Sequence, residues 1–376
     1  MNRTVLITGA RGFIGRNLLE TMRATRPDLA PLPFDVDDPP EALDAFIAQV
    51  DAVVHLAGVN RPKDVGEFQE GNADWTRTLL GKLEAAGTAE GMRIPLILSS
   101  STQAALANPY GESKQAAEAA VFTYGERTGA EVAVYRFPNV FGKWSRPNYN
   151  SAVATFCHNI ARGLPITVND PNAPLTLVYI DDVVAEILSA LVGKPNRVGD
   201  FCEVAVAHRT TVGEVADAIR GFARSREERS VPDLGDALTR KLYATYLSFL
   251  PTDGFAYPLT MHADARGSFT EFLRTPERGQ VSVNVSKPGI VKGNHWHHTK
   301  VEKFLVVSGR GVIRFRAVGG AEVVSYPVSG ERLEVVDIPA GYTHSIENTG
   351  DTDLVTVMWA SEPFDPEKPD TYPLQV

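Results

Sequence analysis

The sequence predicts an α/β domain with a doubly wound parallel sheet, followed by a smaller all-β domain. Short apolar runs alternate with helical patterns through the first part of the chain, which is typical of a parallel sheet with helices on both faces. A glycine-rich turn directly follows the first apolar run. After Pro251 the helical patterns stop, and short strands separated by turn residues predict a small antiparallel sandwich or barrel.

The elements of the first domain follow from these patterns in chain order. Strands are expected over 4–7, 31–34, 52–56, 95–98 and 131–136, and helices over 13–24, 41–50, 72–86 and 112–127. Thr211 and Glu214 have the spacing of a capping box, which predicts a helix that runs to about residue 226. A last amphipathic helix is expected over 236–250.

The second domain is predicted to contain strands and no helix. The expected strands are 281–285, 303–307, 311–316, 333–338 and 354–359, and 251–258 is the expected linker. The predicted domains are therefore 1–250 and 251–376.

Composition excludes several classes of protein. The 376 residues include 46 acidic and 37 basic side chains, a formal net charge of −9, whereas binding to nucleic acid or anionic membranes needs clustered cations. No apolar run reaches the roughly 18–20 residues of a membrane span. The start of the chain lacks the pattern of a signal peptide, and two cysteines are too few for a disulfide framework. These features predict a cytoplasmic protein.

The turn after the first strand predicts a dinucleotide site. Gly9 and Gly12 permit a tight turn and close approach to a pyrophosphate, and Gly15 lets helix and strand pack closely. The phosphates would face free N–H groups at the positive end of the helix dipole. A lone glycine triplet often only makes turns, but its place at the first strand end favours a cofactor. The predicted cofactor-binding residues here are Gly9, Arg11, Gly12, Phe13, Ile14 and Gly15.

A serine-rich strand end and a tyrosine–lysine pair form a candidate catalytic group. Tyr110 and Lys114 are four residues apart and share one helix face, and Ser101 ends the preceding strand. A nearby ammonium favours the phenolate, which predicts a lowered pKa for Tyr110. An isolated pair of this spacing is more often a buried tyrosine beside an ordinary lysine; the glycine turn and the serines favour catalysis.

These motifs resemble the extended short-chain dehydrogenase/reductase family of nucleotide-sugar enzymes over roughly residues 1–245. Further matches are His55-Leu-Ala-Gly58, Arg136-Phe-Pro-Asn-Val-Phe-Gly142 and Val178-Tyr-Ile-Asp-Asp182. The resemblance implies a Rossmann-type fold and hydride transfer from a nicotinamide cofactor. It implies Tyr110 as general acid, Lys114 as ribose ligand, Ser101 or Thr102 beside the sugar keto group, and Asn139 as a substrate contact.

The sequence departs from this family in two places. The interval from Gly15 to His55 is short, which predicts that one βα unit is missing. Ser101 also lies only nine positions before Tyr110, a tight connection.

The choice of cofactor depends on charges near the glycine turn. Arg11 could pair with a 2′-phosphate, which favours NADPH. Asp35 and Asp37 could instead bind a ribose hydroxyl, which favours NADH, or simply begin the next helix. The sequence prediction is NADPH.

Histidines in the second domain predict a metal site. In a strand His295 and His297 point to the same face, Glu302 follows closely, and His344 follows a Pro-x-Gly turn. Three imidazoles and a carboxylate suit Zn, Fe, Mn or Ni, although a single His-x-His is usually a solvated cluster. The spacing resembles the two cupin motifs, which implies that these four residues bind metal. Leu333 stands where that pattern has glycine.

The same domain also resembles the dTDP-sugar 3,5-epimerases, a cupin branch that works without metal. The matching segments are Asp264–Glu271, Gln280–Ser286 and Lys292–His295. This resemblance implies that Arg266 and Glu271 contact nucleotide or sugar, while the ordinary alternative is a strand-end ion pair. The late tyrosine acid of that family is not evident. His295 would be a base there and a ligand in a metallocupin, so the base stays unassigned.

The order of the two domains, with segments such as His55–Pro62, Phe141–Trp144 and Gly293–His298, resembles a family of bifunctional capsular-polysaccharide enzymes along essentially the whole chain. The resemblance implies C3 epimerisation of UDP-2-acetamido-2,6-dideoxy-β-L-arabino-hexos-4-ulose, then NADPH-dependent C4 reduction to UDP-N-acetyl-6-deoxy-L-talosamine. It also implies a zinc ion and a homodimer. A second hypothesis is a reductase whose cupin only binds or dimerises. A 4,6-dehydratase would need an acid–base pair where Thr102-Gln103 stands.

Overall fold

The computed structural model describes residues 2–275 and 277–376 and divides into two compact units. One unit holds the chain up to Arg220 together with Gly235–Pro251, and the other holds Gly221–Leu234 with Thr252–Val376. The predicted boundary at residue 250 assigned 221–234 to the first domain. These residues join the second unit because Arg229 contacts its strands: the Arg229 carbonyl accepts the amide of Arg274 at 2.8 Å.

The first unit is built on one sheet with the strand order β2-β1-β3-β4-β5-β9-β8. Its parallel strands are β1 (Arg3–Thr8), β2 (Leu29–Phe34), β3 (Ala52–His55), β4 (Leu96–Ser101), β5 (Val132–Phe137) and β9 (Phe201–Cys202), and β8 (Arg197–Val198) is antiparallel to β9. On the far side of β1 from β3, the sheet ends with the single strand β2. Because only this one strand and its helix separate β1 from β3 in the chain, the interval between Gly15 and His55 is short. As an edge strand, β2 tolerates Pro31 and Pro33.

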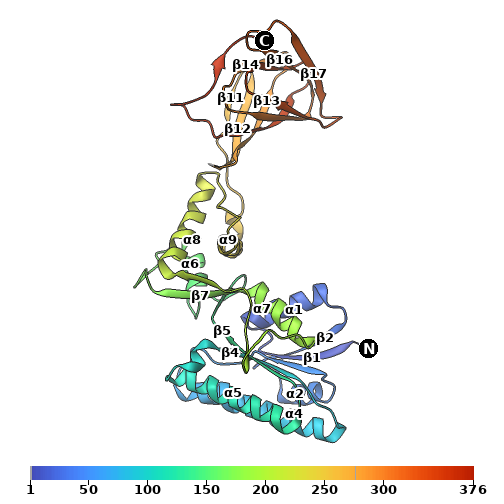
Figure 1. Cartoon of the computed structure of the whole chain (residues 1–376), viewed down its shortest axis with the longest axis vertical. Coiled ribbons are helices and arrows are strands. Elements are labelled where there is room, and N and C mark those ends of the chain that lie inside the picture. Colours follow the sequence, from blue (N-terminus) through green and yellow to red (C-terminus); the bar gives the residue numbers. More distant parts are fainter. Residues whose placement is uncertain (1, 276) are drawn as a thin grey trace. The chain divides into compact units, whose positions relative to one another are not determined.

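Helices cover both faces of this sheet (Figure 1). The pair α1 (Phe13–Thr25) and α7 (Ile180–Leu191) packs on one face, with Leu18 and Val183 fully buried there. On the other face lie α2 (Pro40–Ile47), α4 (Trp75–Glu90) and α5 (Pro109–Thr128), whose apolar side chains form a second core. The predicted doubly wound Rossmann-type fold is confirmed.

A smaller lobe of the first unit lies between β5 and Pro251. Its sheet has the order β10 (His208–Thr211), β7 (Pro174–Tyr179), β6 (Asn139–Phe141). Its helices are α6 (Ala152–Ile160), α9 (Ala237–Ser248) and the part of α8 (Val212–Glu227) up to Arg220. The predicted capping box is confirmed, because the Thr211 amide donates to the Glu214 carboxylate at 2.9 Å and the Glu214 amide to the Thr211 hydroxyl at 3.2 Å. Among the described residues, no helix is both long and apolar enough to span a bilayer.

From Thr252 onward the second unit contains two antiparallel sheets, and the all-β class predicted for this part of the chain is confirmed. One has the order β11 (His262–Asp264), β12 (Gly267–Thr275), β13 (Gly279–Ser286), β20 (Leu354–Ala360), β15 (Glu302–Ser308), β18 (Val335–Ile338). The other has the order β17 (Val323–Ser329), β16 (Arg310–Ala317), β19 (Tyr342–Asn348), β14 (Val291–Trp296), β21 (Tyr372–Pro373). Apolar side chains from both sheets, such as Phe304 and Ile346, form its core.

Candidate functional site

The glycine turn joins β1 to α1 at the carboxyl end of the parallel sheet. Gly9 has φ +68°, and a Cβ there would meet the Ala57 amide nitrogen at 2.7 Å, so only glycine fits without strain. Gly12 precedes the first residue of α1 without a side-chain cap. The amides of the first turn, including those of Phe13 and Ile14, could therefore donate to an anion, and cofactor binding there stays a prediction.

Gly15 allows α1 to lie directly against this turn, and its replacement by alanine is expected to be destabilising. A Cβ at Gly15 would meet the Gly9 carbonyl oxygen at 2.3 Å, so the helix or the turn must move, at a cost of about 1–3 kcal/mol. We expect Gly15→Ala to lower both the free energy of unfolding, measured in urea, and the affinity for dinucleotide. Gly81→Ala in α4 is the matched control. Apart from its chain neighbours and its own helix backbone, no atom of the described residues lies within 4 Å of the added Cβ, so the substitution should stabilise by about 0.5–1 kcal/mol.

Charged side chains of both signs surround the end of β2 beside this turn. The guanidinium of Arg11 forms an ion pair with Asp38, and its backbone amide donates to the Asp35 carboxylate at 2.7 Å. The hydrogen bond from Arg11 lowers the pKa of Asp38. The Arg11 side chain is 56% exposed, and exposed ion pairs contribute little to stability, so Arg11 can exchange this partner for another anion.

The candidate catalytic residues converge at the ends of β4 and α5. Asn108 caps α5 by accepting the Gly111 amide at 2.8 Å, and Pro109 occupies the first helical turn. This cap places Tyr110 beside the end of β4, close to Ser101. One turn later, Lys114 Nζ donates to the Ser99 carbonyl at 3.1 Å. A short 3₁₀ helix (Thr102–Ala105) makes the tight nine-residue connection feasible.

The predicted lowering of the Tyr110 pKa by Lys114 is wrong for this arrangement. Burial raises the pKa of Tyr110, and the hydrogen bond from Ser101 offsets this only in part. Burial also lowers the pKa of Lys114 to about 8, against the effect of the Glu118 carboxylate. The Lys114 ammonium is held by a carbonyl on β4 and is not the partner of the phenol. With its pKa above that of a free tyrosine, Tyr110 is protonated at neutral pH, as any unperturbed tyrosine is, and this is the state that a proton donor requires.

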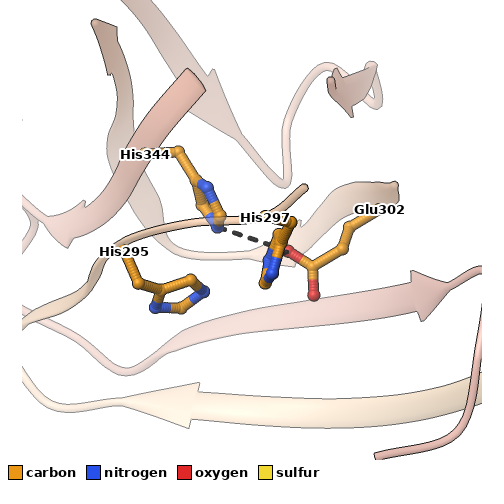
Figure 2. Close-up of side chains that lie close together, drawn as sticks. All are labelled: His295, His297, Glu302 and His344. Atoms are coloured by element: carbon orange, nitrogen blue, oxygen red, sulfur yellow. Dashed lines mark ion pairs between the residues drawn. The ribbon is translucent and has the colours of Figure 1, made fainter. Parts of the chain in front are cut away.

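Four side chains of the second unit point toward one another between its two sheets (Figure 2). His295 lies on β14, His297 directly after it, Glu302 at the start of β15 and His344 on β19. One ligand atom from each lies within 4.8 Å of the others. A β-bulge between Gly293 and His295 aligns His295 opposite His344, and Gly293, at φ +94°, makes it possible.

The polar atoms of this group fit a metal ion. His297 Nε2 and His344 Nε2 lie 3.4 Å and 3.2 Å from Glu302 Oε2, and both rings are almost fully buried. All three atoms lack a hydrogen-bond partner among the described residues, although buried polar atoms are nearly always satisfied. Burial alone would raise the pKa of Glu302, but the two imidazoles lower it to about 2. Burial lowers the pKa of His295 to about 4, so its ring is neutral, as a ligand must be.

Comparisons with known proteins match two different parts of the chain to two protein families. The model of the NAD dependent epimerase/dehydratase family matches residues 5–201, and that of the polysaccharide biosynthesis C-terminal domain matches residues 262–372. The chain belongs to the NAD dependent epimerase/dehydratase family. It is 45% identical, over 99% of its length and 98% of the relative's, to the UDP-2-acetamido-2,6-beta-L-arabino-hexul-4-ose reductase of Pseudomonas aeruginosa.

Solved structures extend the likeness to both units of this family member. The capsular polysaccharide assembling protein CapF of Staphylococcus aureus is 52% identical, with a TM-score of 0.93 and complete coverage of both chains. The UDP-glucuronic acid 4-epimerase of Bacillus cereus, solved with UDP-glucuronic acid and NAD, is 17% identical with a TM-score of 0.54. It covers 65% of this chain and 98% of that one, and it shows the epimerase/dehydratase fold alone.

The remaining predicted substrate contacts lie on different elements: Thr102 and Asn139 belong to the first unit, and Arg266 and Glu271 to the second. Thr102 follows Ser101 directly and is exposed. Asn139 is exposed on β6, and its amide donates to the Thr176 carbonyl at 3.4 Å. Arg266 pairs with Asp264, and Glu271 accepts the Arg229 guanidinium at 3.0 Å. Arg266 and Glu271 thus each form an ion pair with a third residue, and their contact with nucleotide or sugar stays a prediction.

Sequence reasoning missed two buried residues that hold α5 in place. Glu118 accepts both the Arg136 guanidinium, at 2.6 and 3.0 Å, and the Ser100 hydroxyl at 2.5 Å. Its position four residues after Lys114 on the same helix was an available signal. Asn72 accepts the Val59 amide at 2.9 Å and donates to the Ser113 hydroxyl at 3.0 Å, and no sequence pattern pointed to it.

Proposed function

We propose that the protein is a bifunctional nucleotide-sugar enzyme with a different reaction in each unit. The second unit would epimerise C3 of UDP-2-acetamido-2,6-dideoxy-β-L-arabino-hexos-4-ulose, and the first would reduce C4 to UDP-N-acetyl-6-deoxy-L-talosamine. This product lies on the route to UDP-N-acetyl-L-fucosamine for capsule or O-antigen. The observation that carries the proposal is the full-length similarity to a reductase named for this sugar class, in a chain that has two separate polar sites.

In the reductase unit the residues around Tyr110 have distinct tasks. The nicotinamide supplies the hydride that C4 receives. Tyr110, which is protonated at neutral pH, donates its proton to the C4 oxygen as the alkoxide develops. Ser101, with Thr102 beside it, holds the keto oxygen, Lys114 binds the ribose, and Asn139 contacts the substrate. The backbone amides of Gly9 to Gly15 would hold the pyrophosphate of the cofactor.

We assign NADPH as the cofactor because Arg11 is an exposed guanidinium at the end of β2. A phosphate would replace the Asp38 carboxylate as its partner, and hydrogen bonds to charged groups contribute about 1.5–3 kcal/mol, or roughly 10–150-fold in affinity. Arg11→Ala should therefore weaken NADPH binding by about that factor and leave NADH binding nearly unchanged, as measured by fluorescence titration. A wild-type protein that prefers NADH would contradict the assignment and favour Asp35 as a ribose ligand.

In the second unit we propose that His295, His297, Glu302 and His344 hold a zinc ion in a cupin barrel. A divalent cation there would act as a Lewis acid toward the C4 ketone of the sugar and acidify the neighbouring C3–H. Arg266 and Glu271 would contact nucleotide or sugar after exchanging their ion-pair partners. The residue that removes the C3 proton stays unassigned.

The two reactions need this order for a chemical reason. The C4 ketone makes the C3 proton acidic, so the configuration at C3 can change only while the ketone is present. Reduction at C4 removes that acidity and makes the new configuration permanent. With both activities in one chain, each epimerised sugar could be reduced before its C3 configuration reverts. We also propose that the protein is cytoplasmic and forms a homodimer.

The experiment is incubation with the UDP-4-ketosugar and NADPH, followed by NMR of the product at C3 and C4. We expect inversion at C3 and an alcohol at C4, and an unchanged C3 would refute the two-step proposal. Incubation in D₂O without reduced cofactor distinguishes the two activities, because reduction cannot occur and only epimerisation places deuterium at C3. Absence of deuterium there would favour the alternative, in which the second unit is only a metal-stabilised binding or dimerisation module.

A further inference from the structure

The C-terminal segment lies against the strand that carries His295. Strand β21 pairs with β14 in antiparallel register, with His295 opposite Pro373 and Trp296 opposite Tyr372. This pairing brings residues 369–371 beside the turn at 298–300, which follows His297. The two segments are about 70 residues apart in the chain, so their contact exists only in the folded unit.

The carboxylate of Asp370 holds this turn in place. It accepts the backbone amides of His298 at 3.0 Å, Thr299 at 3.0 Å and Lys300 at 2.9 Å, and also the Thr299 hydroxyl at 3.1 Å. Asp370 itself has φ +37°, in the left-handed region that non-glycine residues rarely adopt. Such a conformation persists only where the surrounding contacts determine it.

The carbonyl of the same residue contacts a predicted metal ligand. His297 Nδ1 donates to the Asp370 carbonyl oxygen at 2.5 Å. This bond places the ring proton on Nδ1 and leaves the lone pair on Nε2, which faces Glu302. Histidine ligands of metals are usually oriented in this way by a partner on the other ring nitrogen.

Lys300 makes a second connection in the opposite direction. Its side chain is buried, and Nζ donates to the Pro369 carbonyl at 2.9 Å and to the Thr371 hydroxyl at 3.2 Å. Two charged side chains therefore connect the segments. Asp370 accepts hydrogen bonds from the turn at 298–300, and Lys300 donates hydrogen bonds to residues 369 and 371. Ordering a buried ammonium and a carboxylate here costs desolvation, which these hydrogen bonds offset.

We propose that Asp370 is a positioning residue for the metal group, so that the C-terminal segment completes the site by orienting His297. The inference rests on the proposed metal-binding role of His295, His297, Glu302 and His344. Asp370 does not bind the ion itself. It sets the tautomer and direction of one ligand, and its loss should therefore weaken divalent-cation binding without removing any ligand.

The test uses the full chain and measures Zn²⁺ affinity by chelator competition, together with the visible spectrum of bound Co²⁺. Asp370→Ala should weaken Zn²⁺ binding about 10–100-fold and change the Co²⁺ spectrum, as expected for the loss of an orienting partner. Asp370→Asn keeps one acceptor oxygen, and asparagine tolerates the left-handed backbone. Its Zn²⁺ affinity should therefore fall less than that of Asp370→Ala. Asp365→Ala is the control, because that carboxylate accepts only the nearby Glu367 amide and should leave both readouts unchanged.

Three outcomes are distinguishable. Wild-type affinity and spectrum in Asp370→Ala would overturn the positioning role and leave the metal site intact. A wild-type chain that binds neither ion would overturn both the metal site and this inference. If Asp370→Ala does not fold, Lys300→Met tests the same connection. It should also weaken Zn²⁺ binding in a chain that melts cooperatively, and unchanged affinity there would count against the proposal.

Discussion

Tyr110→Phe is expected to abolish most of the C4 reduction while leaving C3 exchange intact. The substitution removes the proton that the C4 oxygen receives, and general acid catalysis typically contributes about 10²–10⁴-fold. The phenyl ring keeps its contact with Phe68, whose centroid lies 5.5 Å away, so cofactor binding should change little. The measurement is NADPH oxidation with the UDP-4-ketosugar, beside deuterium incorporation at C3 in D₂O.

Tyr124→Phe provides the matched control on the same helix. Its hydroxyl donates to the Ile94 carbonyl at 2.8 Å, far along α5 from Ser101, so its removal should cost about 1 kcal/mol of stability and no turnover. A Tyr110→Phe enzyme with a wild-type reduction rate would show that another group donates the proton. Equal losses in both variants would indicate damage to α5 as a whole.

Glu302→Gln is expected to remove tight metal binding and, with it, deuterium exchange at C3. The substitution keeps the side-chain shape but replaces the carboxylate that faces His297 and His344 with a neutral amide. Loss of a partner that only orients a ligand already costs 10–100-fold in affinity, so loss of a ligand should exceed about 100-fold. Zinc competition and C3 exchange measure the two effects, and NADPH binding should remain at the wild-type level.

His298→Ala is the control within the same His-Trp-His-His segment. Its ring packs against Trp296 and Tyr372 and is not part of the four-residue group. We expect it to retain zinc and exchange. If Glu302→Gln lost zinc but kept C3 exchange, the epimerisation would not need the metal. The second unit would then work like the metal-free dTDP-sugar 3,5-epimerases that its sequence resembles.

Much of the fold could be predicted from the sequence because its signals are local. Alternating strands and helices predicted the parallel sheet, and the Thr211–Glu214 spacing predicted a capping box that the structure contains. The strands β12, β14, β17 and β19 were not predicted, because polar and charged residues interrupt their apolar patterns. Their place depends on pairing with distant strands rather than on local preference.

The candidate sites divide in the same way. The sequence by itself determined which residues are grouped: spacing on one helix placed Tyr110 near Lys114, and close spacing in the chain grouped His295, His297 and Glu302. Only the tertiary structure decided their electrostatics. Burial reversed the predicted direction of the Tyr110 pKa, and Asp370, far from His297 in sequence, became its hydrogen-bond partner. Desolvation and long-range contacts arise when distant segments pack, so no local pattern could encode them.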